Sequence, residues 1–311
     1  MYYPYFRGKQ FELITIREMS QLLAEKEFIP VIEPVRESLG GLKRTLSAVC
    51  DAGGRAIVIV NPYHGDHQED GTDITDLLQE DFKGLDNISA GILLRTEMTV
   101  DEVLACYGRH VDHHPVLIHA GFTAHKVLAM ELGKVMAELT NIFIEDHANT
   151  LYRKHFEGST RILIRDGFKR RKNSEFAKVP VEPFSELHLT FRSDLGMNGF
   201  GDFLTVGDAY SDGGGPAYAV AIHLTFIDPD ADGVMNIYHF VSTTNDTPTD
   251  PAGKFAQALA KLIEKLDGGA SNILETSAIQ EFRSLHAKGH FPGLGYVKKL
   301  SMKHHIETLA A

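Results

Sequence analysis

The hydrophobic pattern of the first half of the chain alternates between short aliphatic runs and longer amphipathic stretches. Apolar runs typical of strands buried on both faces occur at residues 56–60, 88–94 and 116–118. A short aromatic segment broken by Pro4 lies at residues 2–6, and residues 28–35 predict a strand that ends at Glu33 and Pro34. The stretches between them place apolar residues three and four positions apart, which predicts helices at residues 11–26, 39–52, 74–82 and 124–139. Thr99 and Glu102 have the spacing of a capping box and predict the start of a further helix.

Residues 141–168 contain the clearest copy of this repeating unit, with a strand, a helix and a second strand. The first strand ends at Glu145 and Asp146, and the second ends at Arg165 and Asp166. Charged side chains cannot continue an aliphatic strand into a core without a large desolvation cost. We therefore expect both charged pairs at the edge of a sheet, and the helices between strands require parallel pairing.

After Phe168 the pattern becomes irregular. It predicts an eighth strand at residues 203–206, a β-hairpin at 218–227 and 234–241, and helices at 251–266, 274–288 and 294–309. Eight strand–helix units are the number that closes a (β/α)8 barrel. We therefore predict a single α/β domain over residues 1–311, a TIM-type barrel. Its regular units occupy 1–168, with a hairpin insertion near the last strand and extra C-terminal helices.

An open, doubly wound parallel sheet is the rival fold for this alternation of strands and helices. Such sheets bind nucleotides at a glycine-rich turn after the first strand. No strand here is followed by the G-x-G-x-x-G pattern, so the barrel is the favoured prediction.

Polar residues follow the last aliphatic residue of six predicted strands. These residues are Glu33, Asn61, Arg95, His119, Glu145 and Arg165, and Arg7 takes the same place after the first strand. If the strands end in register, all seven side chains point into the barrel mouth, where active sites of this architecture lie. The positions two residues further are Tyr63, Glu97, Gly121, His147 and Gly167, and the glycines would leave space for a ligand.

The predicted ring combines cations with acids. Planar guanidinium groups suit a phosphate or a carboxylate, and the ring supplies Arg7, Arg95 and Arg165. Glu33 and Glu145 are candidate proton donors and acceptors, and His119 is a candidate proton shuttle. Lys9, Asn61 and Glu97 are further candidate ligand-binding residues.

Oxygen ligands at the strand ends also suggest a metal site. Carboxylates favour Mg²⁺ or Mn²⁺ over Zn²⁺, and the candidate ligands are Glu33, Glu145, His119, Asp146 and Asp166. Lys9 is the only lysine near these strand ends, so Schiff-base chemistry is not predicted. A structural network of Arg–Glu pairs is the alternative interpretation, because the charges of the ring are nearly balanced. The desolvation cost of such a layer favours a ligand site.

Two groups of histidines lie outside the ring. His64, Asp66 and His67 fall in the loop after the third strand, which would overhang the barrel mouth, and a solvated loop is the default interpretation. His223 and His239 fall on the paired strands of the predicted hairpin. A structural pair is expected there, with metal ligands as the alternative.

The composition narrows the class of protein. The formal net charge of -11 over 311 residues argues against a broad surface for nucleic acid or anionic membrane. No apolar run approaches the ~20 residues of a membrane span, and the N-terminus lacks the apolar stretch of a secretion signal. Cys50 and Cys106 lack metal-ligand spacing, which indicates thiols in a reducing cytoplasm.

Four short motifs carry a resemblance to a known family. The segments YFRGKQFEL, IPVIEPV, IVNP and GDF followed by AVAIHLT resemble a bacterial and phage family called the beta-protein family. The resemblance covers most of the chain and implies a barrel-like fold and a setting in mobile elements or phage defence. The family has no characterised function, so the resemblance implies no catalytic residue, although Arg7, Lys9, Glu33 and Asn61 lie inside its motifs.

These observations lead to two functional hypotheses. The first is an enzyme that binds an anionic small molecule at the strand ends, such as a phosphoester hydrolase. In that enzyme three arginines clamp the anion, Glu33 and Glu145 exchange protons, and His119 assists. The second is a non-catalytic partner or sensor subunit of a phage-defence or mobile-element module, which acts through a protein partner.

Overall fold

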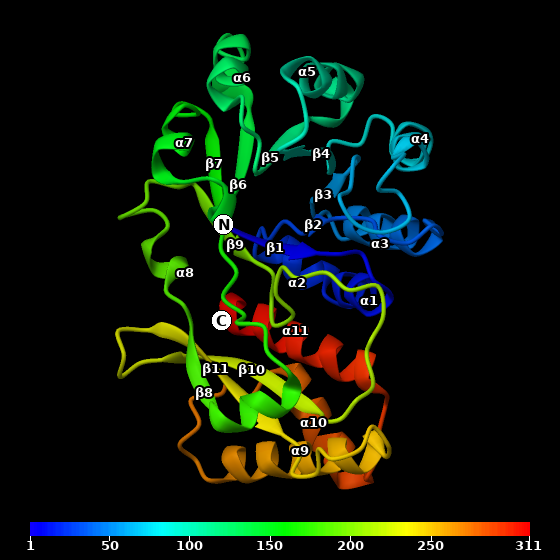
Figure 1. Ribbon diagram of the computed structural model, residues 1–311, viewed down its shortest axis with the longest axis vertical. Coiled ribbons are helices and arrows are strands. Elements are labelled where there is room, and N and C mark those ends of the chain that lie inside the picture. The colour runs from blue at the N-terminus through cyan, green and yellow to red at the C-terminus, as the bar shows by residue number, and fades with distance from the viewer. The chain divides into compact units, whose positions relative to one another are not determined.

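The computed structural model describes residues 1–311, which divide into two compact units (Figure 1). Unit 1 comprises Met1–Arg165 and Thr190–Phe203, and unit 2 comprises Asp166–Leu189 and Leu204–Ala311. The chain therefore crosses between the units three times. Whether the two units form the single domain that the sequence predicts depends on how they pack together. The single domain therefore stays a prediction.

Unit 1 is a closed barrel of eight parallel strands, which confirms the predicted fold class. The strands follow one another around the barrel as β1 (Tyr2–Phe6), β2 (Val31–Ile32), β3 (Ala56–Ile59), β4 (Ile88–Arg95), β5 (Val116–Ala120), β6 (Thr140–Ile144), β7 (Thr160–Ile164) and β9 (Gly199–Asp202). Strand β9 pairs with β1 and closes the circle, with Gly201 opposite Tyr3.

Helices connect the strands of unit 1 and lie around the outside of the barrel (Figure 1). They are α1 (Gln10–Glu18), α2 (Ser20–Glu25), α3 (Gly40–Asp51), α4 (Thr72–Asp81), α5 (Val100–Arg109), α6 (His125–Glu131) and α7 (Thr150–Lys154), with 3₁₀ turns η1 (Val111–His113), η2 (Met136–Glu138) and η3 (Glu145–His147). The capping box predicted at Thr99 is present at the start of α5. Cys50 in α3 and Cys106 in α5 are free thiols. No helix of the chain has the length and apolar content that crossing a bilayer requires.

The prediction of the eighth strand at residues 203–206 is wrong, because the strand is β9, immediately upstream. Its sequence contains Gly199 and Gly201 and has no aliphatic run. A Cβ at Gly201 would lie 2.1 Å from the carbonyl oxygen of Tyr3, and one at Gly199 would lie 2.7 Å from the ring of Tyr3. Close approach to β1 therefore requires glycine, and this requirement removes the hydrophobic signal on which the prediction relied.

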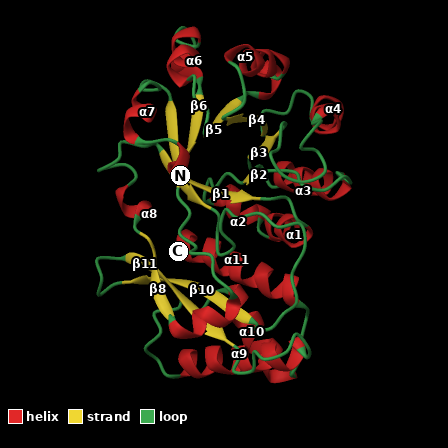
Figure 2. Cartoon of the chain, in the orientation of Figure 1, coloured by secondary structure: helices red, strands yellow, loops and turns green.

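Unit 2 is an antiparallel sheet with three helices (Figure 2). The sheet order is β10 (Ala221–Asp228), β11 (Val234–Val241) and β8 (Val181–Ser185), and the helices are α9 (Pro251–Asp267), α10 (Ser277–Lys288) and α11 (Leu294–Ala310). The predicted hairpin and C-terminal helices are confirmed. Strand β8 was not predicted, because it is short and contains Pro183. The 3₁₀ helix η4 (Asn173–Lys178) precedes β8, and the short helix α8 (Leu187–Thr190) follows it.

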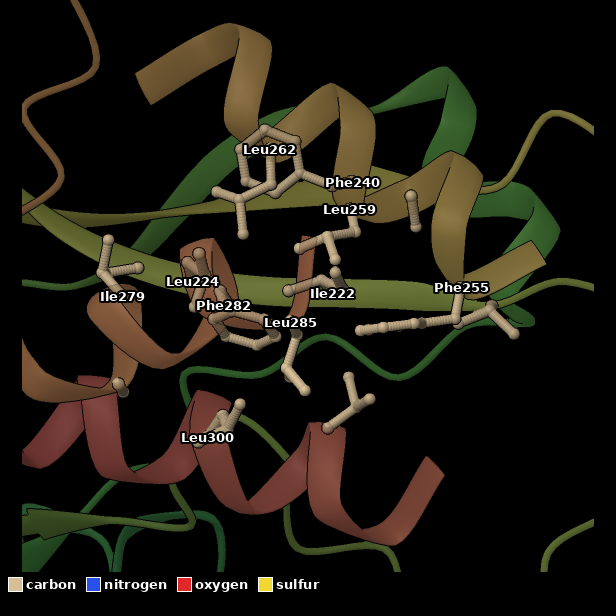
Figure 3. Close-up of a cluster of buried hydrophobic side chains, with 14 of the residues drawn as sticks. Ile222, Leu224, Phe240, Phe255, Leu259, Leu262, Ile279, Phe282, Leu285 and Leu300 are labelled. Carbon is tan, nitrogen blue, oxygen red and sulfur yellow. The ribbon is translucent and has the colours of Figure 1, made fainter. Parts of the chain in front are cut away.

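Unit 2 has a hydrophobic core of its own (Figure 3). The core gathers side chains from two strands and three helices, among them Ile222, Leu224, Phe240, Phe255, Leu259, Leu262, Ile279, Phe282, Leu285 and Leu300. Burying each large apolar side chain contributes roughly 1.5–3 kcal/mol. The amphipathic pattern of α9 and α10 thus reflects the packing of one side of each helix in this core, whereas α11 is buried on most of its sides.

Barrel closure at β9 gives a first testable prediction. Replacing Gly201 with Ala should destabilise the protein by about 1–3 kcal/mol, because the new methyl group overlaps the backbone of Tyr3. Gly108→Ala is the matched control: a Cβ there meets no atom within 4 Å, and α5 should gain up to about 1 kcal/mol. Urea unfolding measures both changes, and equal stability of Gly201→Ala and the unsubstituted protein would contradict the account of closure.

Candidate functional site

The interior of the barrel is filled by side chains from alternate positions of each strand. They form one apolar cluster of Tyr3, Tyr5, Ile29, Val31, Ile57, Ile59, Leu93, Val116, Ile118, Ile142, Ile144, Ile162, Ile164 and Phe203. Because side chains alternate across a strand, a residue two positions beyond an interior residue points the same way. Arg7, Glu33, Asn61 and Arg95 follow the interior residues of β1 to β4 in this register, as predicted.

His119, Glu145 and Arg165 do not share this register. Each directly follows an interior isoleucine and so belongs to the opposite face of its strand. The expected ring of seven side chains is therefore wrong for β5, β6 and β7. A parallel barrel strand is buried on both faces, so its aliphatic run can end at an interior or an exterior position.

Glu33 lies at the centre of the interior-facing group, and its side chain is fully buried. Its Oε2 accepts hydrogen bonds from the hydroxyl of Tyr5 at 2.9 Å and from Nη1 of Arg7. Its Oε1 accepts hydrogen bonds from the backbone N–H of Tyr63 at 2.9 Å and of His64 at 3.0 Å, and lies 3.1 Å from Nδ1 of His64. One carboxylate thus joins β1, β2 and the loop after β3.

These contacts determine the charge of Glu33. Burial acts to raise the pKa of Glu33, but the hydrogen bond from His64, the charges of Arg7 and His64 and the hydroxyl of Tyr5 outweigh it and lower the pKa to about 2. Glu33 is therefore a fixed anion at neutral pH. So weak a base exchanges protons poorly near pH 7, and the acid–base role predicted for Glu33 does not suit its environment.

The turn after β1 fixes the position of Arg7. Gly8 has a φ of +63°, and a Cβ there would lie 2.9 Å from the carbonyl oxygen of Glu33. Glu12 in the first turn of α1 accepts a hydrogen bond from the backbone N–H of Arg7 at 2.5 Å, and burial raises the pKa of Glu12. Lys9 is the N-cap residue of α1, and its charge acts on Glu12. Its predicted role in ligand binding stays a prediction.

Arg95 extends the site toward β4. Its guanidinium lies over the ring of Tyr63, 5.8 Å from the ring centroid, and its Nε is 3.0 Å from the Glu97 carboxylate. The side chain of Glu97 is 59% exposed, so solvent screens this ion pair. Arg95 and Glu97 are therefore in direct contact at the end of β4, and their predicted role in ligand binding stays a prediction.

His64 is the residue of this site that the ring prediction omitted. Its ring lies 4.8 Å from that of Tyr63, so contacts run from Arg7 through Glu33, His64 and Tyr63 to Arg95. The sequence placed His64 in a polar loop whose default interpretation was solvation. The one signal in the sequence for a role of His64 was the position of its loop, directly after β3. Its buried partner Glu33, at the end of β2, could not be predicted from the sequence.

Asn61 supports the sheet instead of facing a ligand. Its Nδ2 donates to the carbonyl oxygen of Leu93 at 2.9 Å, and its Oδ1 accepts from the N–H of Leu93 at 2.8 Å. The amide thus acts as one more residue of the β3–β4 ladder. Both of its functional groups already have partners, which leaves the predicted ligand-binding role without support in the geometry.

His119 is buried between β5 and α7 and does not reach the barrel mouth. Its Nδ1 lies 2.8 Å from the hydroxyl of Tyr152, and its Nε2 lies 2.8 Å from Oδ1 of Asn141. Its ring stacks on Phe143 at 4.6 Å, and burial lowers the pKa of His119 to about 3. A neutral histidine with both nitrogens bonded is a packing residue, so the expected placement as a proton shuttle at the mouth is wrong.

Glu145 and Arg165 pair with each other on the exterior-facing register. Both oxygens of Glu145 accept hydrogen bonds from Arg165, at 2.5 Å from Nε and 3.1 Å from Nη2. This bidentate geometry is the strongest form of an Arg–carboxylate contact. The structure therefore separates this pair from the interior-facing group of Arg7, Glu33 and Arg95.

The candidate metal ligands do not form one site. No group of three or more His, Cys, Asp or Glu side chains is placed to hold a metal ion. Asp146 is exposed, whereas Asp166 shapes a turn in unit 2 by accepting hydrogen bonds from the N–H groups of Phe168 and Asp208, both at 2.9 Å. The Mg²⁺ or Mn²⁺ prediction thus lacks a ligand set in this geometry.

The predicted glycine spaces are filled by packing. A Cβ at Gly121 would lie 2.8 Å from Oγ1 of Thr96. Gly167 belongs to unit 2, where a Cβ would lie 2.8 Å from both the ring and the carbonyl oxygen of Phe184. Both glycines allow close contact within the protein, so the expectation that they leave space for a ligand is wrong.

The paired histidines of unit 2 lie together as expected. Nδ1 of His223 is 2.7 Å from Nδ1 of His239, whose Nε2 is 3.2 Å from Oε1 of Glu182. Arg171 holds the same carboxylate with both terminal nitrogens. Burial lowers the pKa values of both histidines, and the hydrogen bonds from Arg171 lower the pKa of Glu182 to about 2. The structural interpretation of this pair fits these contacts.

The burial of Glu33 generates a second prediction. The pKa of Glu33 is lower in the folded protein than in the unfolded chain, so its stabilisation is complete above pH 4.5 and is lost as the pH falls from 4.5 to about 2. Glu33→Gln should lower the free energy of unfolding by about 3 kcal/mol at pH 7. The difference from the unsubstituted protein should shrink below pH 4.5.

Urea unfolding across the pH range measures this difference, with Glu97→Gln as the matched control. The exposed Glu97 should contribute no more than roughly 0.5 kcal/mol. A Glu33→Gln variant as stable as the control at pH 7 would show that Glu33 does not hold the site together.

Comparison with known proteins assigns no family and no function to the chain. No protein-family model matches the chain, and no curated protein sequence matches it. The function is therefore inferred from the contacts of the site, and membership of the beta-protein family stays a prediction.

Proposed function

We propose that the carboxyl ends of β1 to β4 bind an anionic small molecule and that His64 transfers a proton during its conversion. The observation that carries this proposal is the buried Glu33 carboxylate, which holds Arg7 and His64 in fixed positions. A site whose polar groups are oriented before the ligand arrives binds and reacts without the cost of ordering them.

Arg95 is the anion-binding residue best suited to this role. Its Glu97 partner is exposed, so an incoming phosphate or carboxylate can replace that contact at little cost. Tyr63 supports the flat face of the guanidinium, which leaves its edges for the ligand. Arg7 is committed to Glu33 and contributes mainly its positive charge.

His64 takes over the proton transfer that the sequence assigned to Glu33 and Glu145. The Glu33 carboxylate stabilises the tautomer with its proton on Nδ1, so Nε2 is the basic nitrogen. In phosphoester hydrolysis, the oxygen of a water would attack phosphorus while Nε2 takes the proton of that water. The bond from phosphorus to the alcohol oxygen then breaks, and the proton passes to that oxygen.

A non-catalytic partner or sensor subunit is the second candidate, and one observation favours it. Every arginine of the predicted clamp has an acidic partner, in the pairs Arg7–Glu33, Arg95–Glu97 and Arg165–Glu145. A purely structural layer of charges would be paired in this way. The chain would then act through a protein partner, in the phage-defence or mobile-element setting that the sequence resemblance implies.

A ligand screen with two variants tests the first candidate. Phosphomonoesters, phosphodiesters and carboxylates are added to the unsubstituted protein, and a ligand at a hundred times its Kd should stabilise it by about 2.7 kcal/mol. Arg95→Gln should weaken binding of a hit roughly 10-fold to 100-fold, because a charged hydrogen bond is lost. His64→Gln should keep the binding but lower turnover by about 100-fold or more.

Arg109→Gln is the matched control, since Arg109 is an exposed arginine at the end of α5 in the same unit. Binding that is equally strong in Arg95→Gln and in this control would exclude the anion site at β4. Undiminished turnover in His64→Gln would exclude the proton-transfer role. If no compound binds, the partner subunit becomes the better account.

A further inference from the structure

A second group of arginines lies on the exterior-facing side of β6 and β7. Arg161 and Arg165 of the β7 segment alternate with the interior residues Ile162 and Ile164 and therefore face outward. Arg153 of α7 lies within range of their charges. This group is distinct from the interior-facing residues of the barrel mouth.

Arg153 is the unusual member of this group. Arg153 is only 6% exposed, and its Nη2 donates to Oγ1 of Thr150 at 3.2 Å. Its Nε and Nη1 are buried and have no hydrogen-bond partner. Nearly all buried polar atoms of folded proteins have a partner, so two donors without one on a single guanidinium require an explanation.

The neighbouring acids do not supply the missing acceptor. Both oxygens of Glu145 are engaged by Arg165. Strand register places Asp202 beside Arg165, because Ile164 pairs with Gly201, and Oδ1 of Asp202 accepts from Tyr2 at 2.7 Å.

The charges around Arg153 make its burial less favourable. Burial lowers the pKa of the Arg153 guanidinium, Glu145 acts against this, and Arg165 and Arg161 add to the lowering. A cation that is buried beside further cations and lacks acceptors destabilises a fold. An anion bound at the same place would reverse each of these effects.

We propose that Arg153 is the central residue of an anion site on the outer face of the barrel, which takes a tetrahedral oxyanion of the phosphate class. Arg153 supplies two donors without partners, Nε and Nη1, and Arg165 is near enough for its charge to act on this guanidinium. Multiple donors and more than one arginine suit a dianion better than a single carboxylate. The side chains of Arg165 and Glu145 are 25% and 29% exposed, so the cluster opens to solvent through this pair.

The sign of a stability change tests the proposal. Arg153→Met keeps an unbranched apolar side chain close in length to the aliphatic part of arginine and removes the charge and the donors. In a chloride buffer without phosphate this variant should melt at a higher temperature than the unsubstituted protein, because an uncompensated buried cation is gone. Inorganic phosphate at equal ionic strength should raise the melting temperature of the unsubstituted protein by several degrees and leave that of Arg153→Met unchanged.

Lys254→Met is the matched control for removing a buried cation. Lys254 is 2% exposed, and its Nζ donates to the carbonyl oxygens of Ala217, at 3.0 Å, and Thr247. This cation has its acceptors, so the substitution should lower the melting temperature. Opposite signs for the two variants would show that Arg153 differs from a satisfied buried cation.

Three results would overturn the outer site. They are an Arg153→Met variant that is less stable in chloride or fails to fold, a phosphate effect that persists in this variant, and no phosphate effect in the unsubstituted protein. Arg95→Gln separates this site from the barrel mouth. A phosphate effect lost in Arg95→Gln and kept in Arg153→Met would place the anion at the mouth and support the proposed function alone.

Discussion

The carboxylate of Glu33 lies out of contact with solvent and is held by hydrogen bonds from Tyr5, Arg7, Tyr63 and His64. An ionised carboxylate in a core is tolerated only when such donors replace the lost water. The same contacts give the barrel mouth its geometry, because each donor is fixed by bonding to one acceptor. This one side chain thus contacts the guanidinium of Arg7, the ring of His64 and the backbone of the loop after β3.

The local sequence explains why a side chain takes this role. Strand β2 contains only Val31 and Ile32. The strand lies between Pro30 and Pro34, which lack the backbone N–H that would extend the ladder. The backbone ladder of so short a strand makes few hydrogen bonds to its neighbours. The side chain of Glu33 adds hydrogen bonds to β1 on one side and to the loop after β3 on the other. On the outer face, by contrast, no carboxylate holds the Arg153 guanidinium in this way, and its Nε and Nη1 are buried without a hydrogen-bond partner.

The fold could be predicted further than the site. Aliphatic runs identified β3 to β7, and helical periodicity identified α9 to α11, because burial on two faces or on one face leaves a direct pattern in the chain. Strand β9 was missed because its contact with Tyr3 requires glycines. The register was right for β1 to β4 and wrong for β5 to β7, because an aliphatic run does not show which face its last residue occupies. His64 could not be assigned, since its partner Glu33 is distant in the sequence and meets it only after the barrel closes.

The most direct test of this account is an NMR titration of the Glu33 side-chain carboxyl carbon, recorded together with the ring nitrogens of His64. Glu33 is expected to stay ionised until the pH approaches about 2, and Nδ1 of His64 is expected to carry the proton when the ring is neutral. A Glu33 carboxyl group that titrates at or above 4.5, with the neutral His64 protonated on Nε2, would contradict both expectations. The barrel mouth would then lack the fixed anion on which the proposed site depends.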